Sequence, residues 1–277
     1  MLLTITGDIG AGKSTVAKLL ANKLNLDVIE TGDIYRKYAG AKGLSVLEQN
    51  KTDDWEIDRR IDAEISELGK TATNTIFVSR MAWMTIPTAI HIYMKIDPEL
   101  AAKRIFASKG RVAESHSDWR ETLEYNKSRN KLEMDRYKSM YSLSDPSGES
   151  AANIVIDIGS KTPDEIANAI HRIIISKEYG YYVDPLTIFP TRPIRKMQSG
   201  LINSFSETIK SGDCVSIAAI EQYKKKYYAC IDDEKIAMSA RNRVPFVKVK
   251  TVINIKEEPE VKTIYDYEDL IQYRLHA

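Results

Sequence analysis

The sequence has few cysteines, almost no net charge and no long apolar run. Its two cysteines, Cys214 and Cys230, lack the spacing of metal ligands, which favours free thiols in a reducing cytosol. A formal charge of +1 gives no overall electrostatic footprint for DNA or RNA. No apolar stretch approaches the roughly 20 residues that a membrane-spanning helix requires. We therefore expect a cytoplasmic protein that does not bind membranes.

Repeats, low-complexity tracts and clustered histidines are also absent. The four histidines are scattered along the chain, so we expect no metal site built from them. A hydrophobic content of 43% and a charged content of 29% are typical of a globular protein. The 277 residues suffice for one large domain or two ordinary ones.

The most informative motif lies at residues 7–14, which read G-x-x-x-x-G-K-S. An apolar strand pattern precedes it, and the apolar stripe of a helix follows it, which is the context that makes a phosphate-binding loop credible. Glycines let successive backbone N–H groups point at phosphate oxygens, and the helix directs its positive end at the same anion. We expect this loop to bind ATP or GTP and the strand before it to exclude a cleaved signal peptide. The predicted nucleotide-binding residues are Gly7, Gly10, Ala11, Gly12, Lys13, Ser14 and Thr15, with Lys13 on the outer phosphates and Ser14 as the Mg²⁺ ligand.

Residues 1–176 alternate short apolar strands with longer helical patterns. This alternation predicts an α/β domain in which helices cover both faces of a parallel sheet, with the ligand beyond the carboxyl ends of the strands. A last helix is expected to open at Thr162, an N-cap followed by proline. The expected strands are 2–6, 27–29, 75–78, 90–96 and 153–156.

The character of the chain changes after about residue 176. Prolines at 185, 190 and 193 punctuate it, and strand patterns follow at 215–220, 227–231 and 244–255. These features predict a second, smaller α+β domain over residues 178–277.

Two segments of the first domain place arginines after predicted strands. The second strand runs into Thr31-Gly-Asp33-Ile-Tyr-Arg36, and the third ends in Phe-Val-Ser79-Arg80. The first segment resembles the S/T-G-x-x-(Y/F)-R element of cytidylate kinases and related nucleoside monophosphate kinases. The resemblance implies that Thr31, Asp33, Arg36 and Arg80 bind the acceptor nucleotide, because an arginine fork matches a phosphate bidentately. It also implies an acceptor-binding insertion over about residues 37–74. Serine stands at position 79, where the family commonly has glycine.

A third segment, residues 129–141, resembles the R-E-x-S-x-x-x-R-Y-x-x-x-Y lid helix of the same kinases. Arg129 and Arg136 are seven residues apart and therefore share one face of a helix. The resemblance implies that these catalytic arginines, on a lid over about residues 103–138, stabilise the transferring phosphoryl group and exclude water when the lid closes. Asn130 and Leu132 depart from the glutamate and serine of the family pattern.

Residues 227–240 and 244–249 resemble the ParB/sulfiredoxin-like fold. In that family a D-G turn joins a strand to a helix and binds a phosphate or nucleotide. Here Asp233 takes the glycine position and Ile236 that of a basic residue, so we interpret the domain as a degenerate copy with a structural, oligomerising or substrate-positioning role.

Three functions follow from these observations. The first is a kinase that uses ATP and Mg²⁺ to phosphorylate a nucleotide acceptor, most simply a (deoxy)cytidylate-type monophosphate. The second keeps the kinase core but phosphorylates a hydroxyl on a modified nucleoside, on DNA or on another metabolite, with Asp8 or Asp33 as the base. The third is a nucleotide-sensing regulator that associates with DNA through the second domain. The paired lid arginines argue against the third function, and the near-zero net charge argues against tight DNA binding.

Overall fold

A computed structural model describes residues 1–44, 48–49, 51, 55–108, 117–189, 205, 207–208, 214–223, 226–230 and 232–259. The chain forms two compact units. Unit 1 comprises residues 1–158 and 162–179, and unit 2 comprises residues 159–161 and 180–277. The predicted boundary near residue 177 thus lies close to the point where unit 2 resumes, and the turn at 159–161 is grouped with unit 2.

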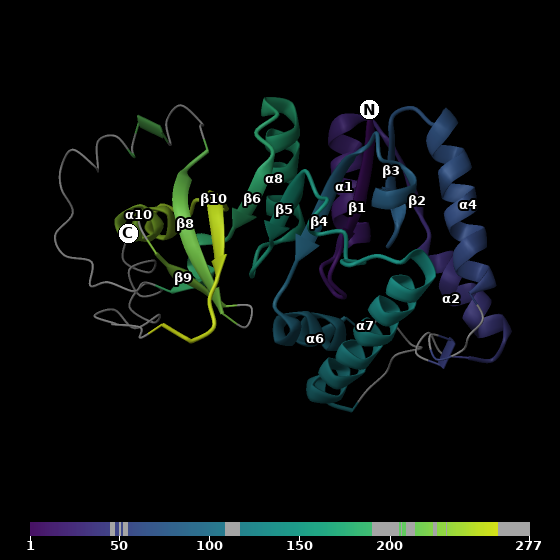
Figure 1. The fold of residues 1–277 in the computed structure, drawn as a ribbon. Coiled ribbons are helices and arrows are strands. Elements are labelled where there is room, and N and C mark those ends of the chain that lie inside the picture. Colours follow the sequence, from purple (N-terminus) through teal and green to yellow (C-terminus); the bar gives the residue numbers. More distant parts are fainter. Residues whose placement is uncertain are drawn as a thin grey trace. The chain divides into compact units, whose positions relative to one another are not determined.

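Unit 1 is built on a parallel sheet flanked by helices, as predicted (Figure 1). The strand order is β2-β3-β1-β4-β5, in which β1 lies centrally because its neighbours β3 and β4 pair with it on either side. The strands are β1 (Leu2–Gly7), β2 (Asp27–Glu30), β3 (Thr75–Val78), β4 (Ile90–Lys95) and β5 (Ile154–Asp157).

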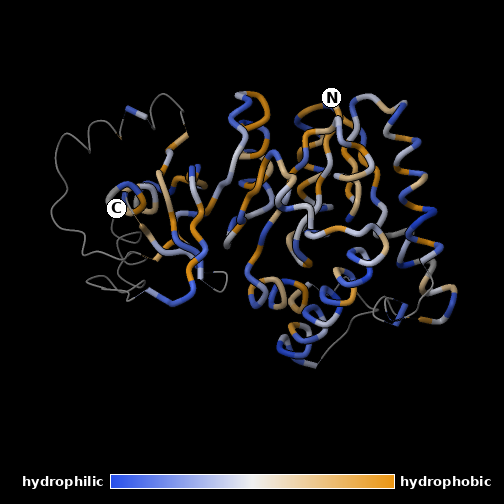
Figure 2. The backbone as a smooth tube through the Cα atoms, in the orientation of Figure 1, coloured by the Kyte–Doolittle hydropathy of each residue, from blue (hydrophilic) through white to orange (hydrophobic). Residues whose placement is uncertain are grey.

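The helices of unit 1 bury apolar stripes against this sheet and against one another. Helix α4 packs its isoleucines against Phe77 of β3 and against α5, while α1 packs on β3 and on α8. Figure 2 shows hydrophobic residues concentrated in the strands, whereas α7 is mostly hydrophilic. The helices are α1 (Lys13–Leu24), α2 (Gly32–Ala41), α4 (Glu56–Thr71), α5 (Ala82–Thr85), α6 (Pro98–Ala107), α7 (Trp119–Tyr141) and α8 (Pro163–Ser176).

Capping explains where two of these helices begin. The Asp97 side chain accepts the Glu99 and Leu100 amides at the start of α6. Thr162 and Glu165 form a capping box at the start of α8, with proline at the first position, as the sequence predicts. Helix α1 differs from both, because Gly12 is its N-cap and no side chain caps its first amides.

The described part of unit 2 contains a mixed sheet in strand order β6-β10-β8-β9-β7, against which α10 packs. The three predicted strand segments correspond to β8, β9 and β10, while β6 and β7 were not predicted. A core around Ile217, Tyr227 and Val247 packs against Ile236 and Met238 of α10. The elements are β6 (Gly180–Val183), the 3₁₀ turn η2 (Pro185–Thr187), β7 (Ile188–Phe189), β8 (Ser216–Tyr223), β9 (Lys226–Ala229), α10 (Asp233–Arg241) and β10 (Val247–Asn254).

The turn before α10 is the segment that resembles the ParB/sulfiredoxin-like pattern. Asp232, and not Asp233, takes the left-handed conformation there, with a φ of 67°. The Asp232 carboxylate accepts the Ala218 amide of β8 and pairs with Lys235. A side chain therefore ties this turn to the sheet. The prolines at 190 and 193 lie outside the described residues. Among the described residues, no helix combines the length and the apolar composition that a membrane crossing demands.

Candidate active site

One cavity in unit 1 is lined by residues from the β1–α1 loop, the start of α2, α4, the end of β3 and α7. Its position at the carboxyl ends of β1 and β3 is where ligands bind in parallel α/β sheets. We divide its lining into two parts. The loop side comprises Gly10, Gly12, Lys13, Ser14 and Thr15, and the helix side comprises Tyr35, Asp58, Asp62, Arg129, Glu133 and Arg136.

Glycine is required at three places in the loop before α1. Gly10 and Gly12 have φ angles of 83° and 74°, in the left-handed region that other residues rarely adopt. Gly7 has a φ of 139°, and a Cβ there would lie 2.1 Å from the carbonyl oxygen of Met94. Because no side chain caps α1, its first N–H groups stay available to an anion at the positive end of the helix.

Lys13 folds back onto the loop that carries it. Its Nζ donates to the carbonyl oxygens of Gly7 and Asp8, at 3.0 and 2.7 Å. Burial lowers the pKa of the Lys13 ammonium, and the nearby positive charge of Arg80 lowers it further. The charges of Asp8 and Glu133 raise this pKa but do not outweigh burial and Arg80, so a negatively charged ligand would stabilise the buried ammonium further.

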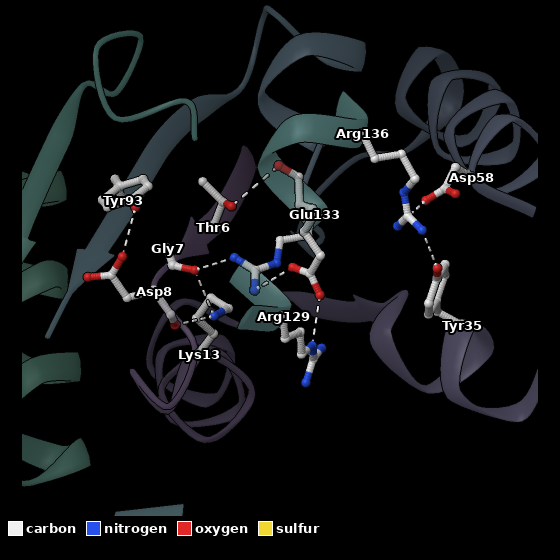
Figure 3. Close-up of polar contacts among 11 residues, drawn as sticks. Thr6, Gly7, Asp8, Lys13, Tyr35, Asp58, Tyr93, Arg129, Glu133 and Arg136 are labelled. Carbon is white, nitrogen blue, oxygen red and sulfur yellow. Dashed lines mark hydrogen bonds and ion pairs between the residues drawn. The ribbon is translucent and has the colours of Figure 1, made fainter. Parts of the chain in front are cut away.

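Asp8 anchors the loop to β4 and to the residues after it. One carboxylate oxygen accepts a hydrogen bond from the Tyr93 hydroxyl at 3.0 Å (Figure 3). The other accepts from the Ile96 amide at 3.1 Å. Asp8 does not line the cavity. Both observations weigh against the sequence-based suggestion that Asp8 acts as a general base.

Glu133 of α7 contacts two arginines, one from its own helix and one from the segment after β3. Its carboxylate lies 2.8 Å from Arg129 Nε and 3.0 Å from Arg80 Nη2. Arg80 also donates from Nη1 to the Gly7 carbonyl oxygen at 2.9 Å. Burial acts to raise the pKa of Glu133, but the charges of Arg80, Arg129 and Arg136 outweigh it and lower the pKa to about 2. Glu133 is therefore ionised at neutral pH and orients two guanidinium groups at the cavity.

Arg136 connects three helices at the other end of the cavity. It donates to the Tyr35 hydroxyl of α2 at 2.6 Å and to Asp58 Oδ1 of α4 at 3.2 Å. Its guanidinium also lies over the Tyr35 and Tyr137 rings, with its central carbon 5.3 and 5.4 Å from the ring centroids. The Arg136 side chain is only 4% exposed, so these contacts fix it in place.

Two carboxylates of α4 lie one helical turn apart on the helix side. Asp58 faces Arg136, and burial raises the pKa of its carboxyl to about 6 despite that positive charge. Asp62 accepts the Tyr141 hydroxyl, and burial raises its pKa too. These contacts tie α4 to the C-terminal half of α7.

The structure brings most of the predicted site residues to this one cavity. Lys13, Arg36, Arg80, Arg129 and Arg136 all line it, as do Gly10, Gly12, Ser14, Thr15 and Thr31. The buried Thr31 hydroxyl donates to the Val78 carbonyl oxygen at 3.4 Å. Gly7 and Ala11 shape the loop without lining the cavity, and the side chain of Asp33 lies outside the described part.

Sequence reasoning missed Glu133 and left Asp58 without a role. The spacing of Glu133 from Arg129, four residues along a helix, was the available signal, because residues so spaced are neighbours on a helix surface. Asp58 lies in a run of charged residues that a solvated helix face explains equally well. Among the described residues, no cluster of three or more His, Cys, Asp or Glu side chains forms a metal site.

Comparison with known proteins gives a consistent set of matches for unit 1. Residues 9–174 match the profile of the family described as shikimate kinase. The cytidylate kinase of Sulfurisphaera tokodaii is 34% identical over 174 residues, which cover 61% of this chain and 93% of that protein. The cytidylate kinase of Ignicoccus hospitalis is 30% identical, over 63% of this chain and 99% of its own. A shikimate kinase structure from Acinetobacter baumannii, in complex with shikimate, aligns at a TM-score of 0.42 and 17% identity, covering 64% of this chain and 94% of that one.

Proposed function

This chain belongs to the shikimate kinase family, and on that premise we propose that it transfers the γ-phosphoryl group of ATP to a nucleoside monophosphate, with CMP or dCMP as the acceptor. One observation carries the proposal: a phosphate-binding loop and arginines from α7 and from the segment after β3 line the same cavity. The identity to cytidylate kinases over nearly their full length supports the choice of acceptor. The match to the family described as shikimate kinase supports phosphoryl transfer in general.

The loop side suits a nucleoside triphosphate with its magnesium ion. The left-handed glycines, the uncapped start of α1 and the buried Lys13 together form a cradle for a polyphosphate. Ser14 would hold Mg²⁺, in line with the sequence motif, and Lys13 would leave the loop carbonyls to bind the outer phosphates. When bound, Mg²⁺ neutralises charge on the phosphates.

Side chains of the helix side and arginines next to it would stabilise the transferring phosphoryl group and bind the acceptor. An acceptor phosphate oxygen attacks the γ-phosphorus, and the bond to the bridging oxygen breaks as ADP leaves. We assign Arg80, which Glu133 links to Arg129, to the transferring phosphoryl group, and Arg136, together with Arg36, to the acceptor. This assignment exchanges the roles that the resemblance implied for Arg80 and Arg136. No general base is needed, because a phosphate acceptor is already ionised near pH 7.

A hydroxyl acceptor is the second candidate, and one observation bears on it. Such an acceptor would want a carboxylate base within hydrogen-bonding reach. Asp8 is occupied by Tyr93 and Ile96 outside the cavity, and the described cavity lining holds four other carboxylates, those of Glu30, Asp58, Asp62 and Glu133. Since each of the four already contacts a lysine, an arginine or Tyr141, the phosphate acceptor is favoured.

We propose that residues 178–277 position or oligomerise the kinase without catalysing a reaction themselves. The Asp232 turn supports this, because its carboxylate ties the turn to β8 where the ParB/sulfiredoxin-like pattern would bind a phosphate. The mass of the full chain in solution, measured by light scattering, tests the oligomer. If the full chain is a monomer at all concentrations, residues 178–277 do not oligomerise it, and only the proposed positioning role remains. Cytoplasmic residence remains part of the proposal, and we propose no DNA association.

An acceptor screen tests the proposed function. ADP release by the full chain with Mg²⁺ and ATP would be compared across CMP, dCMP, UMP, AMP, shikimate and single-stranded DNA. We expect CMP or dCMP to raise ADP release well above the rate without acceptor. Stimulation by shikimate or DNA alone would instead establish a hydroxyl acceptor. No stimulation by any acceptor would contradict kinase activity on these substrates.

A further inference from the structure

Asp8 belongs to the phosphate-binding loop, yet it does not line the cavity. One of its carboxylate oxygens accepts from the Tyr93 hydroxyl of β4, and the other accepts from the Ile96 amide just after that strand. Figure 3 shows the Tyr93 side chain reaching this carboxylate. Both partners are buried, since Tyr93 is 6% exposed and Ile96 2%. The side chain of Asp8 is therefore engaged by β4 and not by a ligand.

The backbone around Asp8 is held from the same side. The Asp8 amide donates to the Met94 carbonyl oxygen at 2.9 Å. Gly7 packs so tightly on Met94 that no residue with a Cβ fits there. Side-chain and main-chain contacts thus fix the start of the loop against the end of β4.

The carbonyl oxygen of Asp8 is the atom that these contacts orient. It accepts from the Lys13 ammonium at 2.7 Å and from the Ala11 amide at 3.3 Å. Lys13 and the loop amides are the donors that we assign to the phosphates of ATP, and such donors bind a phosphate only when they point at it. A shift of Asp8 would therefore carry these donors with it.

We infer that Asp8 is a positioning residue for the donor triphosphate: its hydrogen bonds to Tyr93 and Ile96 hold the loop in the conformation that receives the phosphates. This inference rests on the ATP binding that the proposed function includes. Misplacing a binding group by about 1 Å can cost about 100-fold in activity, so a contact outside the cavity can control binding inside it.

The charge of Asp8 offers a rival explanation. That charge raises the pKa of the buried Lys13 ammonium, so Asp8 could act by keeping Lys13 protonated. Asparagine separates the two explanations. In Asp8→Asn the side-chain oxygen can accept from the Ile96 amide, and the NH₂ group can donate to the Tyr93 hydroxyl, which is able to donate or accept. Asp8→Asn thus loses the charge but can keep both hydrogen bonds, whereas Asp8→Ala loses the charge and the hydrogen bonds.

The test measures nucleotide binding and kinetics in matched variants of the full chain. Calorimetric titration with ADP and Mg²⁺ gives the Kd, and steady-state kinetics with ATP and CMP give kcat and both KM values. We expect Asp8→Ala to raise the Kd for ADP and the KM for ATP by about 10–100-fold, with the KM for CMP within about threefold of the wild type. Asp8→Asn should recover both constants to within about threefold. Asp27→Ala, which removes an exposed carboxylate at the start of β2, is the control and should bind ADP like the wild type.

Tyr93→Phe provides a second variant if Asp8→Ala does not fold. It keeps the charge of Asp8 and removes one of the two hydrogen bonds, so we expect ADP binding to weaken by about three- to tenfold. In the double variant Asp8→Asn with Tyr93→Phe, the asparagine NH₂ group loses its acceptor, and the recovery should disappear. Circular dichroism would establish that each variant is folded before its binding is compared.

Three results would overturn the inference. ADP binding by Asp8→Ala within about threefold of the wild type would show that the loop is positioned without Asp8. Equal losses in Asp8→Asn and Asp8→Ala would assign the effect to charge. An equal rise in the KM values for CMP and ATP would mean general damage to the cavity. A wild type that binds ADP but phosphorylates no acceptor would fail at the proposed function, while the comparison of ADP binding would still decide the role of Asp8.

Discussion

The two sides of the cavity are built from different kinds of structure. The loop side takes its shape from backbone: glycines with left-handed φ angles, the first amides of α1 and a lysine bonded to carbonyl oxygens of its own loop. The helix side is built from side chains that hold one another across large distances in sequence. Arg136 contacts Tyr35 and Asp58, which are 101 and 78 residues away.

This difference in construction predicts that few residue types are compatible with the loop side, whereas the helix side can accept other residue types. A glycine at a left-handed position cannot be exchanged without strain. A charged pair between helices can change partner or polarity as long as every buried charge keeps a counterpart. The loop side is thus suited to a constant donor and the helix side to an acceptor that differs among relatives.

The largest effect should come from the helix side. Arg129→Ala removes a guanidinium from the moving phosphoryl, so kcat should fall by about 10³-fold while the KM for ATP changes little. Steady-state kinetics with ATP and CMP measure both constants. Arg120→Ala, on an exposed arginine of the same helix, is the control and should keep wild-type kinetics. An equal fall in kcat in Arg129→Ala and Arg120→Ala would show that Arg129 does not act on the transferring phosphoryl group.

The loop side should respond with a different kinetic pattern. Lys13→Ala deletes the ammonium that we place on the donor phosphates, so we expect a loss of about 10²–10³-fold in kcat/KM for ATP. Lys23→Ala on the exposed part of α1 is the matched control. If Lys13→Ala raised only the KM for CMP, the assignment of the two sides to donor and acceptor would be reversed.

Replacing Glu133 tests whether its contacts with Arg80 and Arg129 matter for the reaction. Glu133→Gln removes the charge that orients Arg80 and Arg129, so kcat should fall about 10–100-fold with a smaller change in KM. Glu124→Gln, which alters an exposed glutamate of the same helix, should leave kcat unchanged. Identical kinetics in wild type and Glu133→Gln would show that the arginines are positioned without it.

The lowered pKa of Glu133 also predicts a pH dependence of stability. A carboxyl whose pKa is about 2 when folded and about 4.5 when unfolded stabilises the fold by about 3 kcal/mol above pH 4.5. That contribution disappears as the pH falls from 4.5 towards 2. The difference in unfolding free energy between wild type and Glu133→Gln, from urea titrations, should therefore shrink over this range. A difference independent of pH would mean that Glu133 gains nothing from its arginines.

The smallest effect should come from Tyr141→Phe. This change removes one hydroxyl that donates to Asp62 and leaves the stacked ring beside Tyr137. We expect a loss of about 1 kcal/mol in stability, measured by chemical denaturation, with kcat within about threefold of the wild type. A loss of activity as large as that of Arg129→Ala would place Tyr141 in the reaction itself.

The same contrast explains what could be predicted from the sequence. Strands β1 to β5 and the phosphate-binding loop depend on contiguous residues, so local patterns located them within a few residues. Strand β6 was missed because its antiparallel partner β10, which pairs with Tyr181 and Tyr182, lies more than sixty residues later in the sequence. Asp58 and Glu133 were missed as site residues because helix periodicity does not show which charged face is buried against another helix.

The proposed function requires that one cavity transfers a phosphoryl group between two substrates instead of releasing it to water. ATP labelled at its γ-phosphate, incubated with the full chain, Mg²⁺ and CMP, would be followed until the label is distributed among products. We predict that the label appears in CDP, in a molar amount equal to the ADP formed, and that Arg129→Ala slows this transfer by about 10³-fold. Label recovered only as inorganic phosphate, at a rate unaffected by CMP, would contradict it.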